Sequence, residues 1–214
     1  KSKIIPIKDG RIDGSLTEYY GCNQIYGTIP YNAESKQDGD LVYYFPTGEV
    51  SHRIKMTNGK NDGSYVEYYR NGQERELLTF EDGSKEGVVK MFHKNGEIYI
   101  EGEYAANKKV GNWKYFHDNA QLNEEGDWKD GNRIGVWEEY NRFGVLEDVT
   151  DYGEKGTKTG VYKSYDLDGN LTLELEYKGD EVNKYTTYSS DGSVLSSEVK
   201  KKRELDFVGN HDNG

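Results

Sequence analysis

The sequence is poor in several features on which compact globular domains rely. It has one cysteine, Cys22, in 214 residues, so no disulfide can form within the chain. Cysteine usage therefore does not indicate whether the protein resides in an oxidising or a reducing compartment. Only 33% of the residues are hydrophobic, and no stretch approaches the roughly 18 consecutive apolar residues of a membrane-spanning helix. No helical periodicity of useful length is present. These absences exclude a membrane-spanning helix and argue against a thick two-layer domain.

Aromatic side chains are abundant where aliphatic ones are scarce. The chain has 19 tyrosines and three tryptophans. Each of these rings removes roughly 150–250 Å² from water when it is covered. This composition suits a thin stack of similar units in which each unit contacts only its neighbours.

Glycines that open similar segments recur every 23 to 25 residues, at positions 14, 39, 63, 87, 111, 135 and 160, with Asn183 in the eighth place. We number the positions of each unit from its opening residue, which is place zero. The residue at place two is large, and the residues at places five and seventeen are almost always aromatic. Segment 111–135 shows the unit most clearly. A fixed period of this kind predicts one continuous repeat array. Place two holds Leu16, Leu41, Tyr65, Val89, Trp113, Trp137, Tyr162 and Tyr185.

Each unit contains the chemistry of a β-hairpin. Asn-Gly or Asp-Gly pairs lie about nine places into several units and again near the end of several units, where turns need positive φ. Runs rich in Tyr, Trp, Val, Ile and Thr lie between them and fit strands. The Asn119-Ala120 pair departs from the pattern, so we expect a longer or strained turn there. The regular pairs are 71–72, 95–96, 168–169 and 191–192, and then 58–59, 82–83 and 130–131.

We therefore predict an all-β fold, an elongated array of about eight antiparallel β-hairpin repeats of ~24 residues each over residues 14–199. About sixteen strands spaced about 4.8 Å apart would form one sheet about 75 Å long. A rotation of about 20° between neighbouring strands would twist and curl it into a trough. Residues 1–13 are expected to form an N-terminal half-repeat that caps the first edge, and residues 200–214 a charged C-terminal cap and polar tail.

The repeated motif resembles a known family. Gly111-Asn112-Trp113 with Phe116, the aromatic return strand through Trp128, and Asp130-Gly131 followed by Gly135 are similar to MORN repeats. The nearest likeness is to the bacterial variant found in antitoxin-like proteins, and it covers nearly all of residues 4–199. This resemblance implies the hairpin-array fold. It also implies roles such as antitoxin or immunity protein in bacteria and membrane-linked scaffold in eukaryotes.

Histidines and carboxylates do not predict a catalytic or metal site. His93 and His117 occupy the same place in neighbouring units, two strands or about 9–10 Å apart. Zinc, in contrast, needs each nitrogen ligand about 2.1 Å from one ion. Asp166 to Asn170 resemble part of a calcium loop but lack its closing glutamate, so we expect a turn. We expect no enzyme activity, no metal and no cofactor.

Places four and six predict a partner surface. Aromatic and other large side chains occupy them up to the fifth unit, whereas polar side chains occupy them from the sixth unit onward. The two places share strand parity, which puts them on one face, and exposed aromatic patches mark interfaces. Burial by sheet curvature is the alternative interpretation. The candidate partner-binding residues are Tyr43, Phe45, Tyr69, Met91, His93, Tyr115 and His117.

The net charge limits the classes of partner that the chain can bind. The net charge is −11 and the isoelectric point about 4.9, so the chain repels nucleic acid and anionic lipid and attracts basic proteins. Acids at places fourteen and sixteen are expected to pair across strands with lysines at place three.

We predict a non-enzymatic protein-binding scaffold, an exported periplasmic subunit that docks on or occludes a larger envelope or secretion assembly. The chain starts at Lys1, which favours removal of a signal peptide, with removal of a tag as the alternative. Two other functions stay open. One is a cytoplasmic antitoxin or immunity protein that neutralises a basic toxin. The other is a carbohydrate-binding surface protein that stacks sugars on tyrosines.

Overall fold

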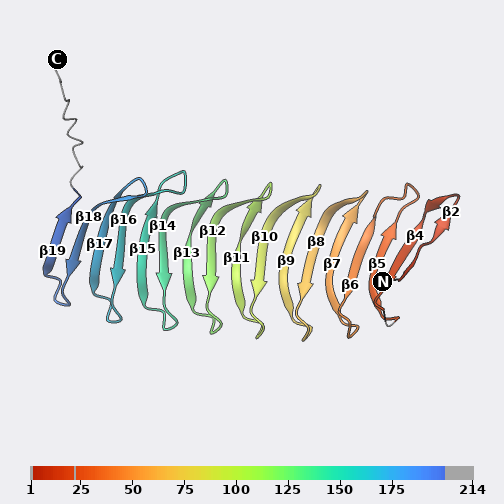
Figure 1. Ribbon diagram of the computed structural model, residues 1–214, viewed down its shortest axis with the longest axis horizontal. Helices are drawn as coiled ribbons and strands as arrows, with labels where there is room; N and C mark the ends of the chain where they lie inside the picture. The colour runs from red at the N-terminus through yellow and green to blue at the C-terminus, as the bar shows by residue number, and fades with distance from the viewer. Residues whose placement is uncertain (1, 22, 201–214) are drawn as a thin grey trace, which may run out of the picture.

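Seventeen antiparallel strands form one long sheet, with a separate two-stranded sheet near the N-terminus. This computed structural model describes residues 2–21 and 23–200. Strand pairing runs from β1 to β4 and then in chain order to β19, without closing into a barrel (Figure 1). The predicted all-β hairpin array is confirmed. Within the described residues no helix is long and apolar enough to cross a membrane.

The strands β4 to β19 form eight hairpins from Gly14 to Val199. In chain order the strands are β1 (Ser2–Ile4), β2 (Ile7–Lys8), β3 (Arg11–Ile12), β4 (Gly14–Tyr19), β5 (Ile25–Tyr31), β6 (Gly39–Tyr44), β7 (Val50–Thr57), β8 (Lys60–Tyr68), β9 (Glu74–Glu81), β10 (Ser84–Phe92), β11 (Ile98–Ala105), β12 (Lys108–Phe116), β13 (Leu122–Lys129), β14 (Asn132–Tyr140), β15 (Leu146–Tyr152), β16 (Lys158–Tyr165), β17 (Leu171–Lys178), β18 (Glu181–Tyr188) and β19 (Val194–Val199).

The N-terminal edge is formed by β1, which pairs with β4, while β2 and β3 make a small hairpin of their own. Ile7 on that hairpin is 68% exposed. Of the predicted C-terminal cap and tail, Lys200 follows β19 directly, and residues 201–214 lie outside the described residues.

The two ends of the hairpins use different turns. At four of the seven connections between repeats, both central residues have positive φ, as at Asn58 (50°) and Gly59 (86°), which identifies type I′ turns. Within a repeat a single described turn residue has positive φ, and it is a glycine in six of the eight repeats, as at Gly72 (84°). The Asn119-Ala120 turn has the same length as the others, so the prediction of a longer turn is wrong. The strained alternative is correct, because Ala120 has φ 64°.

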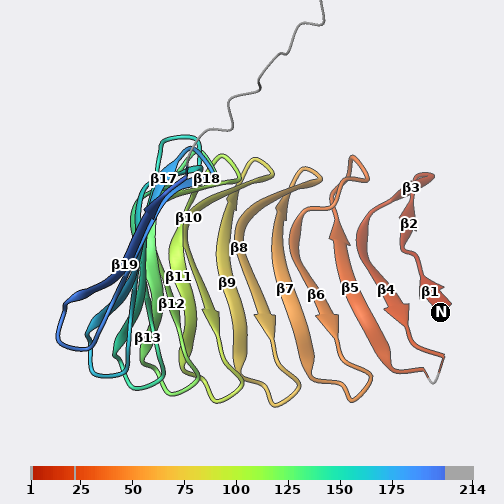
Figure 2. The ribbon, with the colours of Figure 1, turned by 60° about the vertical axis from the view of Figure 1, so that its left-hand side comes forward.

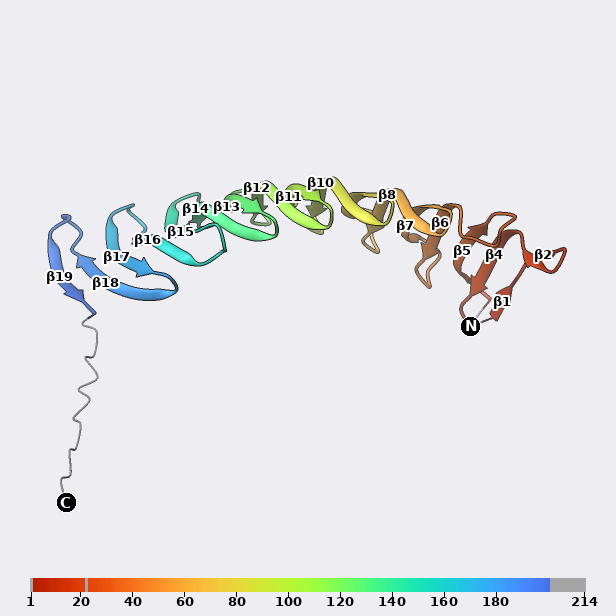
Figure 3. The same ribbon diagram turned by 90° about the horizontal axis from the view of Figure 1, so that it is seen from above.

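The opening glycines of the third to seventh repeats lie at β-bulges. Between β11 and β12, Glu101 pairs with Lys114 and Glu103 with Val110, so three residues of β11 oppose five of β12. Gly111, within that longer stretch, has φ 65°. A bulge bends its strand and increases its twist. The strands are bowed along their length in Figure 2, and the strip arches when it is seen from above in Figure 3.

The buried apolar residues lie on one face of the sheet, which we call the core face. Trp113 and Trp137, both at place two, are 1% and 2% exposed although the sheet is a single layer. Each indole ring lies over a glycine of the preceding strand, Gly102 and Gly126, where an added Cβ would approach the ring to 2.3 Å. In these two pairs the missing side chain of the glycine makes room for the ring. The other pairs are Ile29 with Leu41, Ile54 with Tyr65, Leu78 with Val89, Thr150 with Tyr162, and Leu175 with Tyr185.

The core divides into two clusters along the strip. The first contains Leu16, Ile29, Leu41 and Met56. The second contains Leu78, Val89, Trp113 and Trp137, with aromatic residues of place seventeen up to Tyr152 packed against it. Among the described residues beyond Tyr152, Thr186 alone is buried. The last two repeats therefore have little apolar core.

Candidate functional site

The place-four members of the predicted partner surface lie on the core face and contact the clusters. Tyr43 covers Gly27 and stacks on the ring of His52 at a centroid distance of 4.5 Å. Met91 and Tyr115 pack against the second cluster. These three side chains are half-buried, so they support the core while leaving part of each surface open.

The place-six members lie in the turns, because a register shift between places four and five ends each outgoing strand. The prediction that strand parity puts places four and six on one face therefore fails. Tyr69 Oη donates to the carbonyl of Phe92 (2.7 Å). His93 Nε2 donates to the next such carbonyl, that of Phe116, at 2.9 Å. Since a carbonyl only accepts, Nε2 of His93 carries a proton.

These bonds form a ladder that joins successive repeats at the turns. His117 Nε2 donates to the carbonyl of Tyr140 (2.9 Å), and Asn119 Nδ2 donates to that of Arg142 (2.8 Å). We call this set of side-chain bonds the turn ladder. Phe45 occupies place six without a polar group and lies near the guanidinium of Arg70, at 5.8 Å.

Aromatic side chains at place six end with the fifth repeat, and the turn ladder ends there as well. At place six of the sixth repeat, Asn141 Oδ1 accepts from the backbone N–H groups of Phe143 (2.9 Å) and Val145 (3.1 Å). Asp166 accepts in the same way from Asp168 and Asn170. The predicted turn at Asp166 to Asn170 is confirmed. Local capping thus replaces the bond to the next repeat.

A continuous row of side chains crosses the core face where places four and thirteen meet. Its members are directly opposite one another in register from β6 to β15, so each neighbours the next across a strand pair. No second layer of described residues covers it. We call it the core-face row. It consists of Tyr43, His52, Glu67, Glu76, Met91, Ile100, Tyr115, Glu124, Glu139 and Asp148.

Two carboxylates of the row have perturbed titration. Burial raises the pKa of Glu139 above its ordinary value, and the neighbouring charges of Glu124 and Asp148 raise it further. Burial also raises the pKa of Glu76, against the opposing effect of Lys85. Among the described residues, neither Glu76 nor Glu139 has a cation within ion-pair distance. Glu124 differs, because Arg133 pairs with both of its oxygens.

Cations beside the row are stacked on aromatic rings. Lys109 Nζ lies 4.1 Å from the ring centroid of Trp113 and 4.6 Å from that of Trp128. Arg133 lies 3.9 Å from the ring centroid of Trp137. Burial and the charge of Arg133 lower the pKa of Lys109. Lys109 and Arg133 therefore make cation–π contacts with aromatic rings of the array itself.

The opposite face balances its charges by strand pairing. Lys114 lies between Glu101 and Glu125 in register, and its Nζ is 3.4 Å from Oε2 of Glu125. Lys163 likewise lies opposite Glu174. The predicted cross-strand pairing of lysines with acids is confirmed. The acids Glu101 and Glu174 thus have lysines opposite them in register, whereas Glu76 and Glu139 of the core-face row have no lysine or arginine opposite them on either side.

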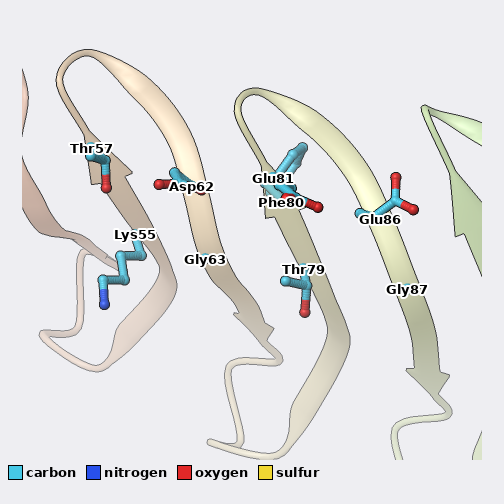
Figure 4. A pocket seen from close by; sticks show the side chains of 9 residues that line it. All are labelled: Lys55, Thr57, Asp62, Gly63, Thr79, Phe80, Glu81, Glu86 and Gly87. Atoms are coloured by element: carbon cyan, nitrogen blue, oxygen red, sulfur yellow. The ribbon is translucent and has the colours of Figure 1, made fainter.

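A hollow of about 540 Å³ separates the hairpin turns of β7–β8 from those of β9–β10 (Figure 4). Two of the carboxylates that line it have structural partners in the next repeat. Asp62 accepts from the backbone N–H of Asp82 (3.4 Å), and Glu86 from that of Ala106 (2.8 Å). Over the part of the chain that the structure describes, no group of three or more histidine, cysteine or acidic side chains is arranged to hold a metal.

Comparison with known families supports a MORN-repeat protein. The family described as a MORN repeat variant matches residues 85–106 and 158–178. No curated protein matches the sequence. Both matched segments contain a strand pair with its opening glycine, Gly87 and Gly160, in the array described above.

Two solved structures show partial likeness. A crystal structure of TarM is 18% identical over 44% of this chain and 20% of that chain, with a TM-score of 0.30. The TcdB2-TccC3-Cdc42 structure is 11% identical over 86% of this chain and 13% of that one, with a TM-score of 0.16. The chain thus spans a fifth or less of either structure's length. At these scores neither likeness bears on fold or function.

Proposed function

We propose that the chain is a non-catalytic scaffold that binds another protein through the core-face row. The observation that carries this proposal is an open row of aromatic, aliphatic and acidic side chains in which Glu76 and Glu139 have no cation partner among the described residues. The match to the MORN repeat variant supports a repeat scaffold.

The partner that fits this row is a basic protein segment. Lysine and arginine side chains would neutralise Glu76 and Glu139, and their stems or guanidinium groups would stack on Tyr43 and Tyr115. The net charge of −11 attracts such a segment from a distance. Binding a cation also removes the like-charge repulsion that the row carries when it is free.

The row includes three of the predicted partner-binding residues, Tyr43, Met91 and Tyr115. The other four lie in the turns, at or beside the turn ladder. They are Phe45, Tyr69, His93 and His117.

The test compares two double variants that change the net charge equally. Glu76→Gln with Glu139→Gln neutralises the row, whereas Glu101→Gln with Glu174→Gln neutralises the opposite face. The first pair should leave the fold intact, because burial already disfavours both charges. Proteins retained from a lysate of the source cells by immobilised wild type and by each variant would be quantified by mass spectrometry.

We expect one basic protein to be retained by the wild type and by the opposite-face variant, and to be lost from the row variant. Equal retention by all three proteins would show that general charge attraction suffices. Retention of nothing by the wild type would contradict a protein-binding role.

The retained protein also separates the finer predictions. An envelope or secretion component would support the exported subunit, and a basic toxin such as a nuclease would support the cytoplasmic antitoxin. Release of the chain by sugars, with no protein retained, would support the carbohydrate-binding alternative. Export itself would be tested by fractionating cells that express the gene's complete reading frame.

A further inference from the structure

The last strand of the array has an open edge. Strand β19 pairs with β18, and no other described strand pairs with it (Figure 1). All six of its residues are exposed, and Leu195 and Val199 are 68% and 60% exposed. It contains no proline, and its single charge is Glu198. Such an edge is a ready template for another strand.

The array itself shows what this edge lacks. In earlier repeats the return strand pairs with the next repeat through places thirteen to seventeen, as Ile100, Glu101 and Glu103 of β11 pair with β12. The equivalent residues of β19 are Ser196, Ser197 and Val199. No described residue pairs with them on that side.

One hydrogen bond shows which residues of β19 point their backbone N–H and C=O groups toward β18 and which point them outward. The N–H of Lys200 donates to the carbonyl of Asn183 at 2.8 Å. Antiparallel pairing alternates, so Glu198 and Ser196 also direct their backbone groups toward β18. Ser197 and Val199 therefore direct theirs outward.

We propose that this edge binds the same edge of a second copy of the chain, with the two β19 strands antiparallel about a twofold axis at Ser197. Ser197 then lies opposite itself as a hydrogen-bonded pair. Leu195 lies opposite Val199 twice, which joins apolar residues, and Glu198 lies opposite Ser196. Moving the axis to Glu198 would place two like charges opposite each other, which is unfavourable.

A second copy suits the edge better than the other end of the array does. Strand β1 has three residues and pairs with β4 over all three, so it offers a short edge to a strand of six. A twofold contact instead presents equal lengths and the same unpaired groups from both sides. The two arrays would then form one continuous sheet.

The contact is small, so the dimer should be weak and concentration-dependent. Each copy carries a net charge of −11, so the copies repel at low ionic strength. Added salt screens this repulsion. We expect the dimer fraction, measured by sedimentation velocity on the full chain, to rise with concentration and with salt.

Ser197→Pro tests the edge without touching the pairing to β18. It removes an outward N–H, and proline is tolerated on edge strands. The variant should keep its circular dichroism spectrum and melting temperature while the dimer dissociation constant rises by at least about tenfold, which corresponds to ~1.4 kcal/mol. A dimer unaffected by this change would overturn the proposal.

A cross-link tests the axis. In a Cys22→Ser background, Ser197→Cys should form a disulfide dimer on mild oxidation, because the Cα atoms of a hydrogen-bonded antiparallel pair are about 5.5 Å apart. Ser64→Cys, which is exposed on β8, is the control.

Cross-linking at equal rates in the two cysteine variants would exclude the twofold axis. A full chain that stays monomeric at every concentration would exclude the dimer. If dimers form after residues 201–214 are deleted but not before, those residues occupy the edge and the proposal is wrong. A failure here leaves the core-face row untouched, because no residue of that row lies on β19.

Discussion

Gly126 shows how one missing side chain permits a large ring to be buried in a single-layer sheet. An added Cβ at Gly126 would lie 2.3 Å from Cδ2 of Trp137, a separation that packed atoms do not tolerate. We predict that Gly126→Val lowers the free energy of unfolding by about 1–3 kcal/mol through overpacking. Thermal or urea unfolding would measure it.

Gly21→Val is the matched control for that substitution. Neither glycine has positive φ, and an added Cβ at Gly21 meets nothing within 4 Å, so the control should change stability by less than about 0.5 kcal/mol. Combining Gly126→Leu with Trp137→Val recreates the Leu78 and Val89 pair of an earlier repeat. The double variant should recover part of the loss. If Gly126→Val and Gly21→Val changed the free energy of unfolding equally, the close contact between Gly126 and the Trp137 ring would not limit the size of the side chain at position 126.

Glu139 should make the array less stable as pH rises. Its pKa is raised in the folded chain above its ordinary value of 4.5, so the folded state binds more protons in the window above that value. The free energy of unfolding therefore falls as pH rises through the window. We expect Glu139→Gln to be more stable than the wild type at pH 7, with the difference vanishing below about pH 4, where the carboxyl is protonated in both states. Melting temperatures across pH would show it.

Glu101→Gln, on the opposite face between Lys90 and Lys114 in register, removes the same charge and serves as the control. It should not stabilise the fold. A Glu139→Gln variant that is no more stable than the wild type at pH 7 would show that the row carries no repulsion.

At the scale of the hairpin, some turns both cap themselves and bond to the next repeat, whereas others only cap themselves. Asn119 Nδ2 donates to the carbonyl of Arg142 in the next turn. Asn141, one repeat later, uses its Oδ1 for its own turn, and its Nδ2 is buried without a partner in the described part of the chain. Asn119 Oδ1 also accepts from the backbone N–H of Gln121 (3.2 Å), so Asn119 both caps its own turn and joins two repeats, whereas Asn141 only caps its own turn.

Replacing each of these asparagines by aspartate separates the two roles with one change of charge. Asn119→Asp removes the donor and places a second acceptor against the Arg142 carbonyl, so it should lower the free energy of unfolding by about 0.5–1.5 kcal/mol. Asn141→Asp keeps the accepting oxygen, as Asp166 does in the next repeat, and should cost less. Urea unfolding of the two variants at equal ionic strength would measure the difference. A larger loss at Asn141 would contradict these roles.

Over the whole molecule, stability should decline toward the C-terminal end. In an array, each repeat is stabilised by its own packing and by its neighbours, and the second cluster reaches no further than Tyr152. We predict that backbone amides of β16 to β19 exchange with solvent faster than those of β10 to β14. Hydrogen exchange read by mass spectrometry would compare the two regions in one sample. Uniform exchange would indicate that strand pairing alone sets stability here.

The period and the turn residues were sufficient to predict the hairpin array. Glycine spacing, Asn-Gly and Asp-Gly pairs and the aromatic places are local signals, and hairpins are local structures, so positive φ at Gly72 and Asn58 follows from residue type alone. The candidate partner surface was predicted less completely. Its place-four members lie in the core-face row, whereas place six lies in the turns.

Only the tertiary structure shows where the place-six side chains lie, because the alternation of side chains along a strand does not predict where the strand ends. The register shift after Met91 and Tyr115 moves the next residues out of the strand, so His93 and His117 bond to the following repeat. The bulge at Gly135 then sets which residue of one hairpin faces which residue of the next, and so brings Glu124 opposite Glu139. That alignment depends on backbone geometry at Gly135, and a sequence pattern read with a period of two contains no term for the extra residues of a bulge.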